Sequence, residues 1–177
     1  MKLKTQLKNY LLGKFQCTYN TIWNQELFND NRNNMEYGNK LRTFRLFKNV
    51  IKLEPYLLWG NFDQRRSLTK FRISAHDLEI EKGRYKNLKV AERVCRLCGT
   101  GTEDEVHFLL QCPRLRQSRI SIIDQIALKY KNFLNLDTKA QFIWLMSAED
   151  TFIFKKVNEL LVNLSEKKKE LLLTNDC

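Results

Sequence analysis

The sequence lacks features on which several protein classes depend. Only two prolines and six glycines interrupt its 177 residues, which favours helices over a chain of short strands and turns. Its most apolar run, Phe142 to Met146, is too short to cross a bilayer. The first residues carry no hydrophobic run of the kind that a signal peptide has. We therefore expect no membrane partner.

Motifs for catalysis are equally scarce. The chain has two histidines, no glycine-rich phosphate loop, no Ser/His/Asp set and no paired carboxylates in an apolar setting. Glu166 and Lys168 have the E-x-K spacing of a restriction-like nuclease, but they lie in a charge-rich helical pattern with no preceding strand. Chance explains that match. We expect no enzyme activity from this polypeptide and no small-molecule substrate.

Cysteine and histidine supply the one constellation that dictates chemistry. Cys95, Cys98, His107 and Cys112 have the spacing C-x2-C-x8-H-x4-C. Three thiolates and one imidazole form a closed tetrahedral shell for Zn²⁺ and leave no position for a catalytic water. The spacing therefore predicts a structural zinc site.

The residues around the four ligands predict their local structure. We expect a small hairpin over Val94–Gly99 and a helix over Glu103–Gln111, with Thr102 as its N-cap. Residues i and i+5 on an α-helix diverge by roughly 140°. Cys112 should therefore lie just past the helix end, where Pro113 prevents simple continuation.

The cysteines have two other interpretations. They could be buried thiols beside a hydrogen-bonded histidine, or they could form disulfides. Five cysteines leave one unpaired, and Cys95 and Cys98 are badly placed for a mutual bridge. A reducing, intracellular compartment fits this pattern better. Cys17 and Cys177 lie far from the cluster in sequence, and neither is needed as a ligand.

Charge is the second informative feature. The formal net charge is +11, and its excess lies within residues 1–119, whereas residues 120–177 balance their basic and acidic side chains. Such a chain suits a polyanion, so we expect RNA or DNA as a partner.

A helix predicted over Ser67–Leu78 gives this charge a location. One apolar stripe on this segment contains Leu68, Phe71, Ala75 and Leu78. A second, exposed stripe would place basic and polar groups near the cations of the following loop. The predicted contacts to the nucleic-acid backbone are Arg65, Arg72, His76, Lys82 and Arg84, with Thr69, Lys86 and Lys89 nearby. The alternative interpretation is a solvated helix face with ordinary surface charges.

The rest of the chain also favours helices. The sequence predicts one or two amphipathic helices over 2–28, a loop at Asn29–Asn34, helices at Leu41–Ile51 and Pro55–Trp59, and helices within 123–134 and 153–164. The expected fold is mainly α: a helical domain with one small zinc-bound β-hairpin and helix unit. We divide it into residues 1–38, residues 39–119 with the zinc unit, and residues 120–177, which pack on the same domain.

Three segments carry a resemblance to a known family. They are Lys40-Leu41-Arg42-Thr43-Phe44-Arg45-Leu46-Phe47-Lys48, Leu68-Thr69-Lys70-Phe71-Arg72-Ile73-Ser74-Ala75-His76 and Leu78-Glu79-Ile80-Glu81-Lys82-Gly83-Arg84-Tyr85. With Glu92 to Cys98 and Glu103 to Pro113, this order resembles the zinc-binding region that follows the polymerase in reverse transcriptases of non-LTR retrotransposons. The likeness spans about residues 40–119.

The resemblance implies a nucleic-acid-binding module with Cys95, Cys98, His107 and Cys112 as metal ligands. No Tyr-x-Asp-Asp sequence is present, so the polymerase does not carry over. We expect a fragment of a larger open reading frame, or a short product, placed in the nucleus or the cytoplasm, with the nucleus favoured. The alternative function is a protein-docking module, for example on the polymerase domain of a retroelement protein, or an inert remnant.

Overall fold

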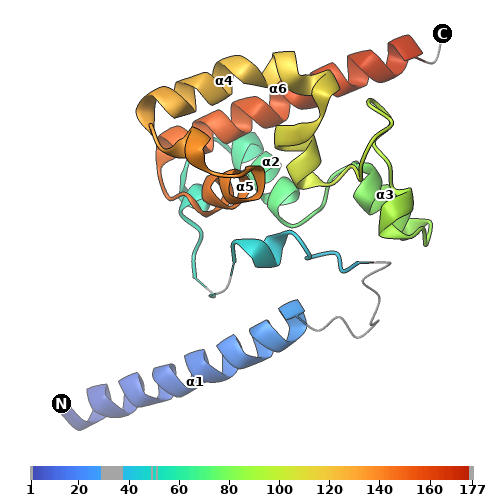
Figure 1. The fold of residues 1–177 in the computed structure, drawn as a ribbon. Coiled ribbons are helices and arrows are strands. Elements are labelled where there is room, and N and C mark those ends of the chain that lie inside the picture. Colours follow the sequence, from blue (N-terminus) through green and yellow to red (C-terminus); the bar gives the residue numbers. More distant parts are fainter. Residues whose placement is uncertain (1, 29–37, 49, 51, 176–177) are drawn as a thin grey trace.

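The structure of the protein is a computed structural model that describes residues 2–28, 38–48, 50 and 52–175 (Figure 1). Its α-helices are α1 (Lys2–Phe28), α2 (Phe62–Arg72), α3 (Glu79–Tyr85), α4 (Arg116–Lys129), α5 (Thr138–Ser147) and α6 (Thr151–Asn175). The short helical turns are η1 (Phe44–Leu46), η2 (Pro55–Leu58), η3 (Val90–Glu92), η4 (His107–Gln111), η5 (Pro113–Leu115) and η6 (Phe133–Asn135). The prediction of a mainly α fold is confirmed.

The predicted hairpin is not formed. Within the residues just given, the β-type pairing is one isolated antiparallel bridge between Val94 and Thr102, and no strand extends from it. Only this one bridge forms, because the chain turns at Cys95–Cys98 and does not continue as an extended strand.

Helix α6 lies at the centre of the hydrophobic core. Its buried side chains are spaced mostly three or four residues apart, as expected for one face of a helix. They are Ile153, Val157, Leu160, Leu161 and Leu164. Helices α4 and α2 pack against it, and η4 contacts both α4 and α6 (Figure 1). The C-terminal helices and the metal-ligand segment therefore share one core.

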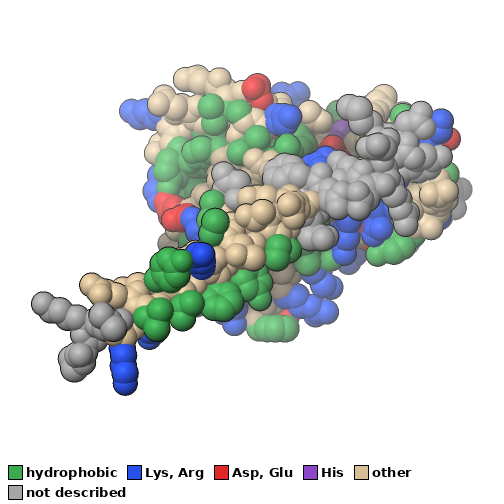
Figure 2. All heavy atoms as spheres, turned by 90° about the horizontal axis from the view of Figure 1, so that it is seen from below, with side chains coloured by type: hydrophobic (Ala, Val, Ile, Leu, Met, Phe, Trp, Pro, Cys, Tyr) green, Lys and Arg blue, Asp and Glu red, His purple; other side chains and the backbone are tan. Residues whose placement is uncertain are grey.

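Helix α1 has the predicted extent, but the apolar side chains at 4–25, the part of it whose side chains are described, are not part of this core. It extends away from the other helices (Figure 1), and hydrophobic side chains gather along it (Figure 2). Leu7, Tyr10 and Phe15 are more than half exposed. Near its C-terminal end the Trp23 ring meets Phe44 edge to face, with centroids 6.1 Å apart.

The basic helix is shorter than predicted. Helix α2 starts with a capping box of Asn61 and Gln64 and ends at Arg72. Ser74 then takes a positive φ of 55°, which turns the chain out of the helix. The predicted stripes are therefore cut: His76 lies beyond the helix, and Leu78 is the residue before α3.

The segment before α2 was predicted to contain two helices, of which one is wrong and one is confirmed. Within the described residues 41–48, the expected helix over Leu41–Ile51 is replaced by the short turn η1. Arg42 pairs there with buried Glu105, whereas Lys48 pairs with the half-buried Glu54. The turn at Pro55 is confirmed as η2, and Gly60 follows it with a φ of +62°. The predicted loop at Asn29–Asn34 lies outside the described residues.

None of the described helices combines the length and the apolar character that crossing a membrane requires.

Candidate metal centre

The four predicted ligands come together. One ligand atom from each of Cys95, Cys98, His107 and Cys112 lies within 4.8 Å of the others. Cys95 Sγ and Cys112 Sγ are 3.9 Å apart, and Cys98 Sγ and His107 Nε2 are 3.4 Å apart. Zinc–sulfur and zinc–nitrogen bonds of ordinary length at tetrahedral angles give edges of about 3.8 and 3.6 Å. The cluster could therefore hold a tetrahedral metal ion.

The first two ligands are presented by a tight turn. The Gly99 N–H donates to the Cys95 carbonyl oxygen at 2.8 Å, and the Cys95 N–H donates to the Gly101 carbonyl oxygen at 3.0 Å. Gly99 and Gly101 have φ values of +67° and +70°, in the left-handed region that glycine adopts at little cost. The glycines allow the chain to reverse directly after Cys98.

The other two ligands are joined by a π-helical turn. Asp104, not the predicted Thr102, caps this segment: its Oδ1 accepts a hydrogen bond from the His107 N–H at 2.8 Å. Residues His107–Gln111 then widen to π geometry, and the Cys112 N–H donates to the His107 carbonyl oxygen at 2.7 Å. This bond spans five residues. It places the two ligands one above the other, which a regular α-helix would not do.

The cluster is largely enclosed. Cys95 and Cys112 are at most 1% exposed, and His107 is 7% exposed. The Thr100 hydroxyl donates to Cys98 Sγ at 3.3 Å, and the same sulfur lies 3.2 Å from the Thr100 carbonyl oxygen. Arg119, buried on α4, donates to the Cys112 carbonyl oxygen.

The thiols are coupled by their contact. The hydrogen bond with Cys112 raises the pKa of Cys95 to about 12, and burial adds to this effect. The same hydrogen bond lowers the pKa of Cys112. A hydrogen bond with Cys95 raises the pKa of His107. Coordination requires thiolates and a neutral imidazole, so metal binding here releases protons and strengthens as pH rises.

A buried ion pair adjoins the cluster. Glu103 Oε1 lies 3.9 Å from Cys95 Sγ, and the ammonium of Lys168 lies 2.9 Å from the same carboxylate oxygen. The Glu79 N–H donates to the other Glu103 oxygen at 2.8 Å. The basic run 167–169 reads from the sequence as a solvated helix end, but Lys168 is 3% exposed. The Lys168 side chain points into the protein, where its ammonium compensates the charge of Glu103.

A second buried carboxylate joins distant parts of the chain. Glu105 accepts hydrogen bonds from Thr43 and Arg42 at 2.7 Å each, and also from Ser74. His76 Nε2 lies 2.9 Å from it. Burial alone would raise the pKa of Glu105, but the His76 hydrogen bond and the Arg42 charge outweigh it and hold the pKa at about 2.

Two predicted nucleic-acid contacts are thus engaged inside the protein. Arg72 is 7% exposed, pairs with Glu54 and donates to the Met146 carbonyl oxygen, so it does not lie on an exposed stripe. His76 is occupied by Glu105. Arg65 is half-buried and donates to the carbonyl oxygens of Trp59 and Gly60. These three side chains therefore have mainly structural roles, because they bond to carboxylate and carbonyl oxygens within the protein.

Lys82 and Arg84 have a different setting. They lie on α3, not in a loop, and both remain partly exposed while pairing with Glu79 and Glu81. The Arg84 guanidinium stacks 4.5 Å from the ring centroid of Tyr85, and Tyr85 is 77% exposed.

Arg93 fastens α3 to the metal-ligand segment. Its buried guanidinium donates to the carbonyl oxygens of Ile80 and Leu88. A Cβ at Gly83 would lie 2.4 Å from Arg93 Cγ, so the glycine leaves the space that this side chain fills. Lys82 and Arg84 are thereby held at a fixed place relative to Cys95.

Glu105, Lys168 and Arg119 adjoin the metal-ligand cluster, but their roles were not predicted from the sequence. Apolar Val106, Phe108 and Leu109 follow the acids of 103–105 and are a signal that these carboxylates enter the core. No local pattern identifies the cations that meet them, since those residues come from distant segments.

No family model matches this chain, and neither a curated protein nor a solved structure does.

Proposed function

We propose that this chain is a zinc-stabilised module that binds the backbone of RNA or DNA and has no catalytic activity of its own. The metal is Zn²⁺, and its role is structural. The observation that carries the proposal is the Cys₃His cluster with a basic, partly exposed segment attached to it.

The ligand set favours zinc over other metals. Soft thiolates and an imidazole in tetrahedral spacing suit Zn²⁺, whereas Mg²⁺ and Ca²⁺ prefer oxygen ligands. Four protein ligands complete its shell, so substrate has no position to occupy. Zinc binding in small motifs supplies roughly 10 kcal/mol or more of folding free energy. That is enough to hold the segment from Cys95 to Cys112 in place.

Residues 82–96 offer the surface for a polyanion. This stretch contains six Lys/Arg residues, of which Arg93 is buried, and one acid, Glu92. Lys86 and Arg96 are exposed, and Arg96 lies between two metal ligands. Exposed Tyr85 offers a ring on which an unpaired base can stack. Binding through such a surface is led by phosphate contacts and is sensitive to salt.

The resemblance to the zinc-binding region of non-LTR retrotransposon reverse transcriptases supports the same function. On this proposal the module accompanies a polymerase domain in a larger protein and grips the nucleic acid that is being copied. Its place of action is the nucleus.

The test is fluorescence anisotropy of the zinc-loaded chain with a labelled structured RNA and with duplex DNA, over a salt series. Replacing Lys82, Arg84 and Lys86 by Gln should weaken binding and flatten the salt slope by about 0.7–0.9 for each phosphate that is no longer neutralised. The matched control replaces Lys131, Lys139 and Lys155, exposed lysines elsewhere, by Gln. Equal loss of affinity in both variants, or no binding of either nucleic acid at low salt, would contradict the proposal.

Helix α1 favours a second candidate function, docking on another protein. It exposes large apolar side chains along its length, among them Leu7, Tyr10, Leu12, Phe15 and Tyr19. If neither nucleic acid binds, Leu12→Asp/Phe15→Asp should still change the self-association of the chain in light scattering. Unchanged scattering would show that α1 does not dock copies of this chain on one another.

A further inference from the structure

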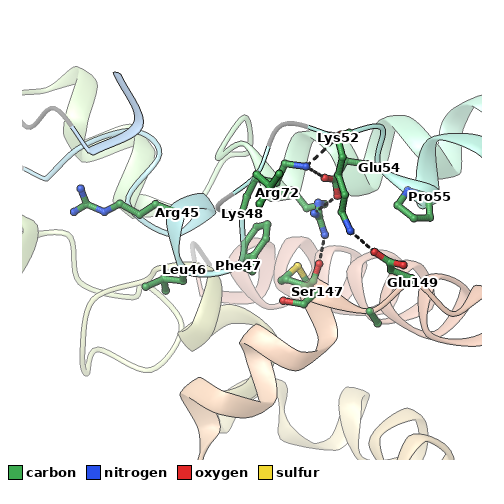
Figure 3. Close-up of a pocket in the computed structure, with 13 residues that line it drawn as sticks. Arg45, Leu46, Phe47, Lys48, Lys52, Glu54, Pro55, Arg72, Ser147 and Glu149 are labelled. Atoms are coloured by element: carbon green, nitrogen blue, oxygen red, sulfur yellow. Dashed lines mark hydrogen bonds and ion pairs between the residues drawn. The ribbon is translucent and has the colours of Figure 1, made fainter. Parts of the chain in front are cut away.

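A pocket of about 480 Å³ lies between η1, the segment that leads into η2 and the C-terminal end of α5 (Figure 3). None of its lining residues belongs to the 82–96 surface. Its ionic lining contains four basic and two acidic side chains, namely Arg45, Lys48, Lys52, Arg72, Glu54 and Glu149. The pocket is therefore a concave site with a surplus of positive charge.

The excess of positive charge is deepest around Glu54, whose side chain is 17% exposed. Lys48 and Arg72 have side chains 8% and 7% exposed, and both pair with Glu54. Arg72 Nη2 lies 2.6 Å from Glu54 Oε2. Two cations thus share one anion in a poorly hydrated place, where an uncompensated charge is costly. Burial lowers the pKa of Arg72. An anion entering the pocket would relieve this imbalance.

The cationic groups are held in position. The Arg72 guanidinium lies between the Phe47 and Tyr56 rings, at 4.6 and 4.8 Å from their centroids, and donates to the Met146 carbonyl oxygen. Lys48 donates to Glu54 and to the Lys52 carbonyl oxygen. An ammonium has three N–H groups, so a third donor remains for a ligand.

Lys52 and Glu149 form an ion pair at the mouth of the pocket (Figure 3). Their side chains are 56% and 58% exposed, and an exposed pair contributes little to stability. Lys52 can exchange this carboxylate for a more highly charged anion at little cost. Arg45 lines the same pocket but extends away from the group (Figure 3).

We infer that this pocket binds a phosphate group, with Lys48, Lys52 and Arg72 as the residues that receive its oxygens. A phosphate monoester carries close to two negative charges at neutral pH and accepts several charge-assisted hydrogen bonds. The group can be the terminal phosphate of a nucleic-acid strand or a free phosphate. The inference is independent of the 82–96 surface.

The experiment is a titration of the ¹⁵N-labelled, zinc-loaded full-length chain with inorganic phosphate, followed by amide chemical shifts at constant ionic strength. Saturable shifts are expected at Arg72 and over 146–149. Lys48→Gln and Lys52→Gln should each weaken phosphate affinity roughly tenfold, the usual effect of removing one hydrogen bond to a charged group. Lys52 is exposed, so its variant tests the site even if Lys48→Gln fails to fold.

Lys139→Gln on α5 is the matched control, because this lysine is exposed and lies outside the pocket. It should leave phosphate affinity unchanged. A 5′-phosphorylated oligonucleotide that shifts the same amides, when its unphosphorylated form does not, identifies the strand end as the source. Shifts with inorganic phosphate alone identify a free phosphate. Equal shifts with chloride, or equal losses of affinity in Lys52→Gln and Lys139→Gln, would overturn the inference.

The same titration separates this site from the proposed nucleic-acid surface. The variant with Gln at positions 82, 84 and 86 should keep its phosphate affinity, whatever happens to its binding of long RNA or DNA.

Discussion

The side chains around the metal-ligand cluster act over long sequence distances. Glu103 is paired by Lys168 of α6, and Glu105 is bonded by Arg42, which precedes α2. A buried charge that loses its partner is strongly destabilising, because the remaining ion stays desolvated. The buried acids therefore tie the metal-ligand segment to both flanks of the chain.

Cys112→Ala should abolish stable zinc binding and reduce helix content, because three remaining ligands leave an open shell and the π-helical turn is no longer tied to the metal. Zinc content by mass spectrometry and far-UV circular dichroism check this. Cys17→Ser is the control, since Cys17 is exposed on α1 and should retain one zinc per chain. Equal zinc content in both variants would contradict the assignment of the ligands.

Glu105→Gln should lower the free energy of unfolding by about 3 kcal/mol, because it removes the anion that Arg42 meets inside the protein. Urea denaturation at pH 7 with zinc present measures the change. Glu170→Gln, at an exposed position on α6, should stay within about 0.5 kcal/mol of the parent. A decrease at Glu105 as small as that at Glu170 would show that the network contributes little.

The ligands could be predicted from the sequence, but most of their neighbours could not. Cys95, Cys98, His107 and Cys112 lie within one short segment, so their spacing carries the geometry. Arg72 was predicted to be a surface cation because helical periodicity assigns it to the stripe of Arg65 and Thr69, which borders the apolar stripe of Leu68 and Phe71. It is buried because Glu54 and the end of α5 cover that side of α2, which local periodicity does not contain.

Helix ends position the functional groups more than helix interiors do. The π-helical turn aligns His107 with Cys112, and the break at Ser74 sends His76 toward Glu105. At the start of α6, Asp150 Oδ1 accepts a hydrogen bond from the Phe152 N–H at 2.7 Å. This is the geometry of an N-cap.

Asp150→Ala should cost about 1 kcal/mol of stability at pH 7, the usual effect of losing an N-cap. The Tyr130 hydroxyl and Lys129 lower the pKa of Asp150 to about 2. The carboxylate therefore stabilises the fold above its ordinary pKa, near 4, and this contribution is lost as pH falls toward 2. Urea denaturation between pH 7 and pH 3 should show the difference from the parent shrinking in the acid range.

Asp124→Ala, at an exposed position within α4, is the control for that series. It changes an exposed carboxylate within a helix. If the Asp150→Ala difference does not shrink in acid relative to the Asp124→Ala difference, the Asp150 carboxylate is not the group that caps α6.

The existence of most elements could be predicted, whereas their ends could not. Apolar periodicity predicted helices at the positions of α1, α4 and α6. The end of α2 depends on a left-handed Ser74, and π widening after His107 depends on packing against α4 and α6. Neither has a local sequence signal of the strength that a proline or glycine gives.

In the molecule as a whole, α1 stands apart from the common core. Deleting residues 1–16 should move the thermal midpoint by less than about 2 °C, because the described side chains among them, at 4–16, are exposed. Thermal unfolding by circular dichroism compares the two chains. Ile126→Ala, at a fully buried site on α4, should lower the midpoint by several degrees and shows that the assay responds. A comparable fall after the deletion would mean that α1 stabilises the core.

The Lys168–Glu103 pair also bears on where the chain can be divided. A piece cut to residues 39–119 would carry all four metal ligands and the basic stretch, yet Glu103 would remain beside Cys95 without its cation. It would also lack the Met146 carbonyl that Arg72 meets. For anyone grafting this metal loop into another protein, the transferable unit is therefore not the loop. It extends to the helix that ends the described chain.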